Sequence, residues 1–529
     1  YSYQTIIEDI RKKDASIPSL YNILLSYQIT KAVEENNSIN YTTDWLFNGN
    51  AGDELQIHLF DINDENKMTI AYDYKSEQFD NQDITDLHNR ILVVINQIVE
   101  NHNLLLKDLE IITPEEKHKI LCDFNNTVAD YPHNQTIIDL FEEQVQKTPD
   151  NIAIEYENIK ISYKELNSRV NQLSNYLNSL NLTNKKNIGI FTNRTIDTLI
   201  GILSILKLGS TFVPIDSLYP GERINHMLKT AQLDIVLSSS TNTPNIDIPI
   251  INIAYNKYSN LNKNFENKPM SPLDNLYIIF TSGSTGTPKG LGLSHKNMVN
   301  LIYFEKNTYS FLEQGNKILQ FATMSFDVSY QEIFSAFLSG CTLVLIDESK
   351  RKNMDLMTEY IAEHNITTLF IPPAYLRLLA ENDKNICLLS KTLKYIITAG
   401  EALLITEGIR KLMKNNIELH NHYGPAETHV ATTYLVPKDI SSSVAPIGKP
   451  ISNTHVYILD SNNNLCPVNV HGQIAISGDC VGNGYINNDK LTSEKFIPDL
   501  FEPAKKMYLT GDIGFIDRNN IINFIERND

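Results

Sequence analysis

The chain has 529 residues, of which 42% are hydrophobic and 20% charged, a balance typical of globular proteins. This length is too great for one domain and predicts two to four. The formal net charge of −18 at pH 7 argues against nonspecific binding to nucleic acid or to an anionic membrane. The most apolar region, residues 196–213, is interrupted by Asp197 and Lys207 and does not predict a membrane span. Five scattered cysteines suggest neither a disulfide framework nor a metal site, which favours the cytoplasm.

The first 118 residues predict an α+β unit. The expected elements are a helix over 3–13, a buried strand over 20–30, half-buried strands over 55–61 and 67–73, and an amphipathic helix over 83–100. The histidines of this stretch are isolated, and no catalytic constellation is visible in it. Turn-prone residues then predict a linker over 119–134.

From residue 135 onward, short apolar strands alternate with helices, which predicts βαβ units around parallel sheets. The first half is expected to have helices over 136–147, 162–180 and 196–208 and strands over 188–192 and 211–216. The second half is expected to have strands over 317–322, 342–346, 367–371, 393–398 and 417–420 and helices over 330–338, 354–364 and 407–414. Strands over 455–459, 473–477, 507–510, 513–517 and 521–525 then predict a small β unit. Ligands of such sheets bind beyond the carboxyl ends of the strands.

One stretch, residues 277–290, reads YIIFTSGSTGTPKG and joins a buried strand to a loop of glycines and hydroxyl residues. Glycines allow the backbone N–H groups to curl toward an anion, and the hydroxyls add donors. Lys289 adds a positive charge. The loop lacks the Gly-Lys-[Ser/Thr] ending of a Walker A motif. The stretch predicts a phosphate loop of another kind, and the alternative is a flexible surface loop.

The segment TSGSTGTPKG resembles the phosphate loop of the adenylate-forming enzymes. From about Tyr131 to Asp529, the chain resembles the amino-acid-activating adenylation domains of nonribosomal peptide synthetases. The implied fold class is α/β: a large N-terminal core of two α/β subdomains and a small β-barrel-like unit, over residues 135–529, ending at the family's hinge residue, Asp529. Residues 1–118 resemble the C-terminal part of a condensation domain. Its His-His-x-x-x-Asp-Gly motif is absent from this stretch, so condensation, cyclisation and epimerisation types stay open.

The resemblance implies a set of nucleotide-binding residues. In the phosphate loop it assigns catalytic roles to Thr281, Ser282, Thr285 and Lys289 and nucleotide contacts to Gly283, Ser284, Gly286 and Thr287. Elsewhere it assigns nucleotide contacts to Gly400, Glu401, Ala402, Asn421, Tyr423, Gly424, Asp512 and Arg527. Glu427 is assigned to Mg²⁺, which prefers oxygen ligands shared with phosphates. Ala426 stands where the family usually has Thr or Ser, which implies a modest loss of affinity.

The resemblance also implies an amino-acid pocket. Its lining positions are Asp327, Val328, Gln331, Phe370, Ile397, Ala399, His422, Val430 and Ala431, and the string D-V-Q-F-I-A-H-V-A is similar to that of proline-activating domains. Asp327 is expected to pair with the substrate's α-ammonium group, although a helix N-cap is the alternative role. The apolar members form a wall for a small ring, and no lining charge is expected to meet a charged side chain. Methylproline or pipecolate also fits, since one methylene is worth only about 1–3 kcal/mol.

These resemblances imply ATP- and Mg²⁺-dependent adenylation of an amino acid, L-proline, followed by transfer to the phosphopantetheine thiol of a downstream carrier domain. The implied partners are this carrier domain, an upstream condensation half and a donor carrier domain. An acyl- or aryl-CoA ligase is one rival, and a catalytically silent scaffold is another. Family members continue beyond the hinge into a subdomain with a catalytic lysine, and losing one such electrostatic donor costs roughly 10²–10³ in rate. The chain alone is therefore expected to bind ligands but to adenylate poorly.

Overall fold

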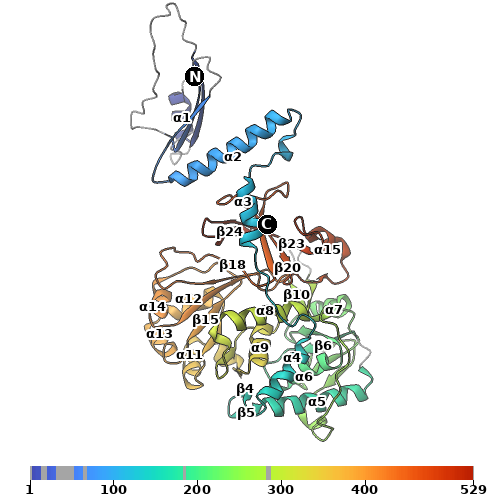
Figure 1. Cartoon of the computed structure of the whole chain (residues 1–529). Coiled ribbons are helices and arrows are strands. Elements are labelled where there is room, and N and C mark those ends of the chain that lie inside the picture. The colour runs from blue at the N-terminus through green and yellow to red at the C-terminus, as the bar shows by residue number, and fades with distance from the viewer. Residues whose placement is uncertain are drawn as a thin grey trace, which may run out of the picture. The chain divides into compact units, whose positions relative to one another are not determined.

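The computed structural model describes residues 3–13, 21–30, 53–62, 68–182, 186–281 and 288–527. The chain divides into two compact units, Tyr1–Thr113 and Pro114–Asp529 (Figure 1). The division follows Thr113, whereas the predicted boundary follows residue 118. None of the helices in the described ranges is both long and apolar enough to cross a lipid bilayer.

The first unit contains a three-stranded sheet in the order β1-β2-β3, in which β2 is parallel to β1 and antiparallel to β3. Its elements are α1 (Tyr3–Arg11), β1 (Ile23–Thr30), β2 (Leu55–Ile62), β3 (Thr69–Tyr74), α2 (Asn81–Glu100) and the 3-10 turn η1 (Leu106–Asp108). The prediction that the first strand is buried is wrong. Ile23, Leu25, Tyr27 and Ile29 are between 54% and 64% exposed. They alternate along β1 and so share one face of the sheet, which the described residues do not cover.

The segment predicted as a linker is an ordered part of the second unit. It follows α3 (Pro114–His118) and begins with a π-helical turn, η2 (Lys119–Phe124). The Asn125 side chain then forms a pair of hydrogen bonds with the backbone of Val456, at 2.9 and 3.2 Å, and the Thr127 hydroxyl donates to the Thr454 carbonyl at 2.8 Å. The segment is therefore fixed to an edge strand of the second unit.

A seven-stranded sheet, in the order β21-β11-β10-β7-β6-β8-β9, forms one part of the second unit. Its strands are β6 (Asn187–Phe191), β7 (Thr211–Ile215), β8 (Val236–Ser238), β9 (Ile250–Asn252), β10 (Asn275–Thr281), β11 (Lys289–Ser294) and β21 (Gly484–Tyr485). The accompanying helices are α5 (Tyr163–Ser179), α6 (Ile196–Lys207), α7 (Gly221–Thr230), α8 (His295–Thr308) and the turn η4 (Tyr255–Lys257). The pairs from β10 to β9 are parallel, as predicted, and β11 turns back antiparallel to β10.

A nine-stranded sheet, in the order β18-β17-β16-β15-β14-β12-β13-β4-β5, forms the second part. Its strands are β4 (Ile152–Tyr156), β5 (Ile159–Ser162), β12 (Lys317–Gln320), β13 (Thr342–Leu345), β14 (Thr368–Phe370), β15 (Tyr395–Thr398), β16 (Glu418–Tyr423), β17 (Thr432–Leu435) and β18 (Lys449–Pro450). Its helices are α4 (Ile137–Lys147), α9 (Val328–Ser339), α10 (Glu348–Lys352), α11 (Met354–Glu363), α12 (Pro373–Ala380), α13 (Asp383–Leu389), α14 (Glu407–Lys414) and the turn η5 (Ser310–Leu312). The strands β13, β12, β14, β15 and β16 run parallel, so their carboxyl ends meet at one edge.

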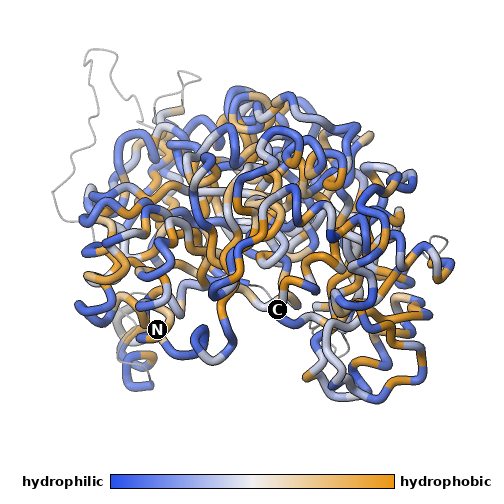
Figure 2. Tube along the Cα trace, turned by 90° about the horizontal axis from the view of Figure 1, so that it is seen from below, coloured by the Kyte–Doolittle hydropathy of each residue, from blue (hydrophilic) through white to orange (hydrophobic). Residues whose placement is uncertain are grey.

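Helix α9 is buried along its whole length from Ser329 to Ser339 and contacts both α4 and α8. Its large side chains Tyr330, Phe334 and Phe337 are among the largest fully buried ones of the chain. A helix that is buried on all sides belongs inside a large core, and the polar side chains Gln331, Glu332 and Ser335 of α9 are hydrogen-bonded there. Figure 2 colours each residue of the trace by its hydropathy, with hydrophobic residues in orange and hydrophilic ones in blue. The helix therefore places its N-terminus, at Asp327, with little freedom to move.

A five-stranded antiparallel sheet completes the unit. Its elements are β19 (Thr454–Leu459), β20 (Gly472–Gly478), α15 (Asp489–Lys495), β22 (Phe496–Pro498), β23 (Lys506–Ile516) and β24 (Ile522–Arg527). The two strands predicted over 507–510 and 513–517 form one strand, β23. Its register against β20 shifts beside Gly511, which has a left-handed φ of 79°. Such a bulge turns a neighbouring side chain out of the regular alternation, and the neighbour here is Asp512.

Candidate active site

Two adjoining cavities open at the edge where the parallel strands end. The larger has a volume of about 390 Å³ and the smaller about 200 Å³, and Gly400 and Glu401, which follow β15, line both. The larger cavity is lined by five of the predicted amino-acid positions: Asp327, Val328, Phe370, Ile397 and Ala399. The residues that bound one side of the cavity thus come from α9 and the ends of β14 and β15.

The other four predicted pocket positions lie elsewhere. His422 lines the smaller cavity. Gln331, Val430 and Ala431 are buried and line neither cavity. Gln331 lies behind His422, with its Nε2 at 3.4 Å from the His422 Nδ1. These residues therefore shape the site from behind its surface.

The expectation of a lining without further charges is wrong. Arg351 and Glu401 also line the larger cavity. The Arg351 guanidinium is engaged, because it donates to both oxygens of Glu348, at 2.7 and 3.0 Å. These hydrogen bonds, with Arg194 nearby, lower the pKa of the Glu348 carboxyl to about 2, so the carboxylate keeps its charge at neutral pH. Much of the Arg351 charge is thus compensated within the wall.

Asp327 occupies the N-cap of α9. Its Oδ1 accepts the Val328 N–H at 2.8 Å, and its carbonyl oxygen faces the Nε2 of His429 at 3.2 Å. The N-cap role proposed as an alternative is therefore present. It uses one lone pair of the carboxylate, and the residue still lines the cavity. An ammonium group can be bound by the remaining lone pairs.

The smaller cavity contains the predicted nucleotide residues of the second half. Its lining includes Gly400, Glu401, Ala402, Asn421, Tyr423, Gly424, Asp512 and Arg527, and also Val444, Ala445, Ile447 and Phe524, which the sequence did not predict. The Tyr423 hydroxyl donates to Asp512 Oδ2 at 2.6 Å, and Arg527 Nη1 lies 3.9 Å from Asp512 Oδ1. Burial raises the pKa of Tyr423 well above its ordinary value, so it stays a donor. Phe524 lies with its ring 6.3 Å from that of Tyr423.

The turn at Gly424 accepts only glycine. A Cβ at this position would lie 1.6 Å from the carbonyl oxygen of His429, which itself has a left-handed φ of 55°. Asn421 is nearly buried, and its Nδ2 donates to the Pro446 carbonyl at 2.8 Å. The local backbone is thus closely packed around the ligand-facing residues.

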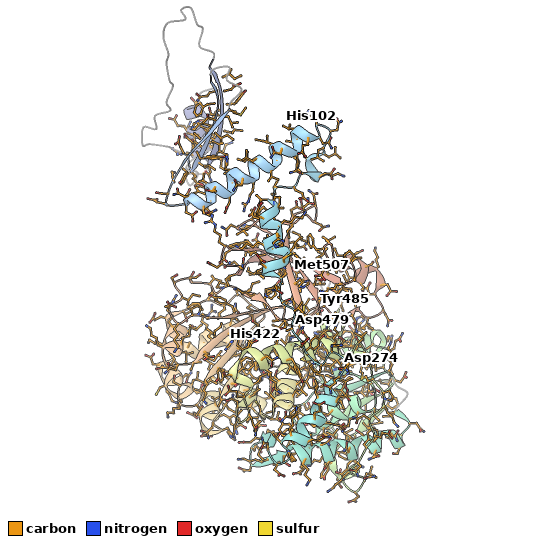
Figure 3. The ribbon with its side chains drawn as sticks, viewed as in Figure 1. His102, Asp274, His422, Asp479, Tyr485 and Met507 are labelled. Carbon is orange, nitrogen blue, oxygen red and sulfur yellow. The ribbon has the colours of Figure 1, made fainter. Side chains whose placement is uncertain are left out.

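Glu427 and Lys289 both interact with one tyrosine, Tyr485. The Tyr485 hydroxyl donates to Glu427 Oε1 at 2.6 Å, and the Lys289 ammonium lies 5.7 Å from the centre of the Tyr485 ring. Figure 3 labels Tyr485 and His422 among the side chains of the second unit. Tyr485 was not predicted, and no local signal marks it, because it belongs to a two-residue strand far from Glu427 in sequence. Lys289 pairs with Thr281 across β10 and β11, so both ends of the predicted phosphate loop are fixed. Ser282, Gly283, Ser284, Thr285, Gly286, Thr287 and Asp529 lie outside the described residues.

The donor chemistry of this corner fits Mg²⁺. The described residues include no group of three or more His, Cys, Asp or Glu side chains arranged to hold a metal ion. Mg²⁺ usually binds enzymes through one or two carboxylates together with substrate phosphates and water. A single carboxylate, Glu427, beside the predicted phosphate loop matches that pattern.

The family model described as AMP-binding enzyme matches residues 141–486. The chain belongs to the AMP-binding enzyme family. Gramicidin S synthase 2 of Brevibacillus brevis is 38% identical over 474 residues, which are 88% of this chain and 10% of that protein. Tyrocidine synthase 2 of Brevibacillus parabrevis is 36% identical over 472 residues, which are 88% of this chain and 13% of that protein. The chain thus spans only a small part of the curated relatives it matches.

Solved structures with the same fold include the nonribosomal peptide synthetase FmoA3. Its TM-score is 0.83 at 19% identity, covering 99% of this chain and 56% of FmoA3. The N-terminal subdomain of Klebsiella oxytoca NpsA, in complex with 3-hydroxybenzoyl-AMSN, has a TM-score of 0.66 at 23% identity, covering 74% of this chain and 100% of that subdomain chain. The predicted adenylation-domain family, its α/β fold and the prediction of an adenylate-forming ligase are confirmed. The condensation-domain resemblance of residues 1–118 stays a prediction.

Proposed function

We propose that this chain activates L-proline with ATP. An oxygen of the amino-acid carboxylate attacks the α-phosphorus, the bond from that phosphorus to the oxygen bridging to the β-phosphate breaks, and pyrophosphate leaves. The observation that carries the proposal is the pair of adjoining cavities, one with Asp327 at its wall and the other with the Tyr423–Asp512 pair. A substrate with an amino group at one end and an adenylate at the other spans both.

The larger cavity supports a compact apolar amino acid. Val328, Phe370 and Ile397 supply its apolar wall, and the carboxylate of Asp327 supplies a counter-charge for the amine. Removing one partner of a buried ion pair costs roughly 3–5 kcal/mol. The same term discriminates against fatty and aryl acids, which lack the amine and are the substrates of the rival CoA ligases.

The smaller cavity supports the nucleoside. A carboxylate can accept hydrogen bonds from two neighbouring ribose hydroxyls, and Asp512 is held for this purpose by Tyr423, with Arg527 close by. Lys289 and Glu427 lie where the phosphates would follow. Mg²⁺ bound by Glu427 would neutralise charge on the phosphates and on leaving pyrophosphate. FmoA3 has also been solved with AMPPNP bound, with a TM-score of 0.84 to this chain.

The proposal extends to the chain's partners. A related structure is an artificially fused adenylation–PCP di-domain of NpsA and ThdA. By analogy, the activated acyl group would pass to the phosphopantetheine thiol of a carrier domain. Residues 1–118 would be the second half of a condensation domain that receives a donor carrier domain, residues 119–134 the connection, and residues 135–529 the adenylation core.

The test is binding of nonhydrolysable aminoacyl-adenylate mimics to this chain, measured by calorimetry and by thermal shift. A ligand that binds only the folded state must raise the unfolding midpoint. We expect the prolyl mimic to bind more tightly than the leucyl, phenylalanyl and salicyl mimics, and Asp327→Asn to remove most of that preference over salicyl. A tighter leucyl or phenylalanyl mimic would refute the proline assignment alone. A tighter salicyl mimic would favour an aryl-acid ligase, and no binding at all would favour a silent scaffold.

A further inference from the structure

A buried carboxyl group lies behind the amino-acid site. Glu305, near the end of α8, has no solvent exposure. Its Oε1 accepts from Gln331 Nε2 and its Oε2 accepts from the Ser335 hydroxyl at 3.0 Å, both on α9. The nearest ionisable nitrogen in the described residues is His422 Nδ1, 3.9 Å from Oε1. That distance is too long for a hydrogen bond.

The hydrogen bonds around Gln331 indicate which ring nitrogen of His422 carries the proton. Gln331 Nε2 carries two hydrogens, of which one goes to Glu305 and the other faces the His422 Nδ1 at 3.4 Å. His422 Nδ1 is then an acceptor, so in the neutral ring the hydrogen is on Nε2. Burial lowers the pKa of His422 well below its ordinary value, so the ring is neutral. In the described residues Nε2 has no hydrogen-bond partner, and His422 lines the smaller cavity. An unpaired buried donor beside a ligand cavity is costly unless the ligand or a water uses it.

We propose that Glu305 is a positioning residue of the amino-acid site, which holds Gln331 and through it fixes the orientation and tautomer of His422. The resulting wall is uncharged and presents one N–H donor. It therefore favours an uncharged group of the bound aminoacyl adenylate that can accept a hydrogen bond at this wall. This inference rests on the proposed function, because His422 lines the smaller cavity, which shares Gly400 and Glu401 with the larger one, and an aminoacyl adenylate would span both.

Burial supports an uncharged wall. It raises the pKa of the Glu305 carboxyl to about 8, against the smaller opposing effect of its hydrogen bonds from Gln331 and Ser335. The other titratable side chains that face Glu305 in the described part of the chain are His422 on β16 and Tyr309 after α8. The pKa of Tyr309 is raised by burial, so neither changes its charge near neutral pH.

The decisive experiment compares affinities for the prolyl-adenylate mimic and for AMP. Glu305→Leu leaves the Gln331 and Ser335 donors unpaired, and we expect it to weaken the prolyl mimic about tenfold or more. AMP should lose less affinity than the prolyl mimic, although His422 also lines the cavity proposed for the nucleoside. Glu305→Gln keeps an acceptor in the same place and should stay within about threefold of the native chain. Ser335→Ala, which removes one bond on the side away from Gln331, is the matched control and should also stay within about threefold. Equal losses for the prolyl mimic and AMP, or no loss for Glu305→Leu, would overturn the proposal.

Two further measurements separate coupling from folding. If Glu305 acts through Gln331, the double variant Glu305→Leu/Gln331→Leu should be no weaker than the worse single variant, and additive losses would overturn the proposal. The native chain should also lose affinity for the prolyl mimic as pH rises through about 8, and Glu305→Gln, which needs no repacking, should remove this loss. Identical pH profiles would contradict the proposal even if Glu305→Leu fails to fold.

The outcomes also separate this proposal from the proline assignment. If the native chain prefers another aminoacyl mimic, proline is refuted, and the same variants are compared with the preferred mimic. If a lysyl mimic binds more tightly than all uncharged ones, the uncharged-wall proposal is overturned. If no aminoacyl mimic binds the native chain, both proposals fail.

Discussion

The hydrogen bond from Tyr485 to Glu427 offers a sharp test of how the metal corner is built. Tyr485→Phe removes one hydroxyl and leaves the ring, which lies 5.7 Å from the Lys289 ammonium and 5.5 Å from the Phe496 ring. The lost contact is 2.6 Å long and joins a phenol to a carboxylate. Hydrogen bonds to charged groups contribute about 1.5–3 kcal/mol.

The lower end of that range applies here. Glu427 is partly exposed, and a second phenol, Tyr508, also interacts with it, so the carboxylate is only partly released. A loss of about 1.4 kcal/mol corresponds to a tenfold change in affinity. We therefore expect Tyr485→Phe to weaken ATP binding about tenfold in the presence of Mg²⁺ and to leave binding in EDTA unchanged.

Calorimetric titration of ATP, with Mg²⁺ and with EDTA, makes the comparison. Tyr131→Phe is the matched control, because its hydroxyl donates to Asp479 at the same 2.6 Å away from the two cavities. The reasoning is refuted if Tyr485→Phe weakens ATP equally in both buffers, since the hydroxyl would then serve the nucleotide and not the metal ligand. Unchanged ATP binding in both buffers would show that Glu427 can bind Mg²⁺ without the hydrogen bond from Tyr485.

Three other predictions concern stability, each measured by urea denaturation. The pKa of Glu305 is about 8 in the folded chain and 4.5 in the unfolded chain. The free energy of unfolding of the native chain should therefore fall by up to about 1.4 kcal/mol for each unit that the pH rises between these values, and that of Glu305→Gln should not. Parallel pH dependences of the two chains would contradict this prediction. Asn125→Ala removes the paired bonds to Val456 and should cost about 2 kcal/mol, whereas a neutral result would mean that the connecting segment is not held there. Glu142→Gln leaves the buried Lys207 ammonium without its anion and should cost about 3 kcal/mol; a cost no larger than that of Lys207→Met would argue against the pair.

The regular elements of the second unit were predictable because their signals are local. The strand predicted over 188–192 is β6 (Asn187–Phe191), and the helix predicted from residue 162 begins with the Ser162 hydroxyl accepting the Glu165 N–H. Apolar runs, caps and turn residues act over a few positions, so a sequence displays them directly. The first strand of the first unit was misjudged for the opposite reason. Burial depends on which elements pack against a strand, and the apolar run over 20–30 does not show which elements these are.

The bulge in β23 marks the limit of local reasoning. Residues 507–510 and 513–517 looked like two strands because Gly511 and Asp512 interrupt the apolar pattern. Pairing with β20 absorbs the interruption and keeps one strand. The interruption is what directs Asp512 toward Tyr423 and the smaller cavity. The two residues that interrupt the apolar pattern, Gly511 and Asp512, thus shape the nucleotide side of the site.

Family motifs and contact geometry answer different questions about this site. A motif predicts which residues belong to a ligand site, such as Gln331 and His422. It does not say which proton those side chains carry, because this depends on partners elsewhere in the chain. Glu305 lies on another helix and follows no motif, yet its bond to Gln331 decides whether His422 offers a donor or an acceptor. Two chains with the same nine predicted pocket residues and different residues at position 305 should therefore differ in substrate affinity. Transferring these nine residues to another chain without Glu305 should transfer the substrate preference only in part.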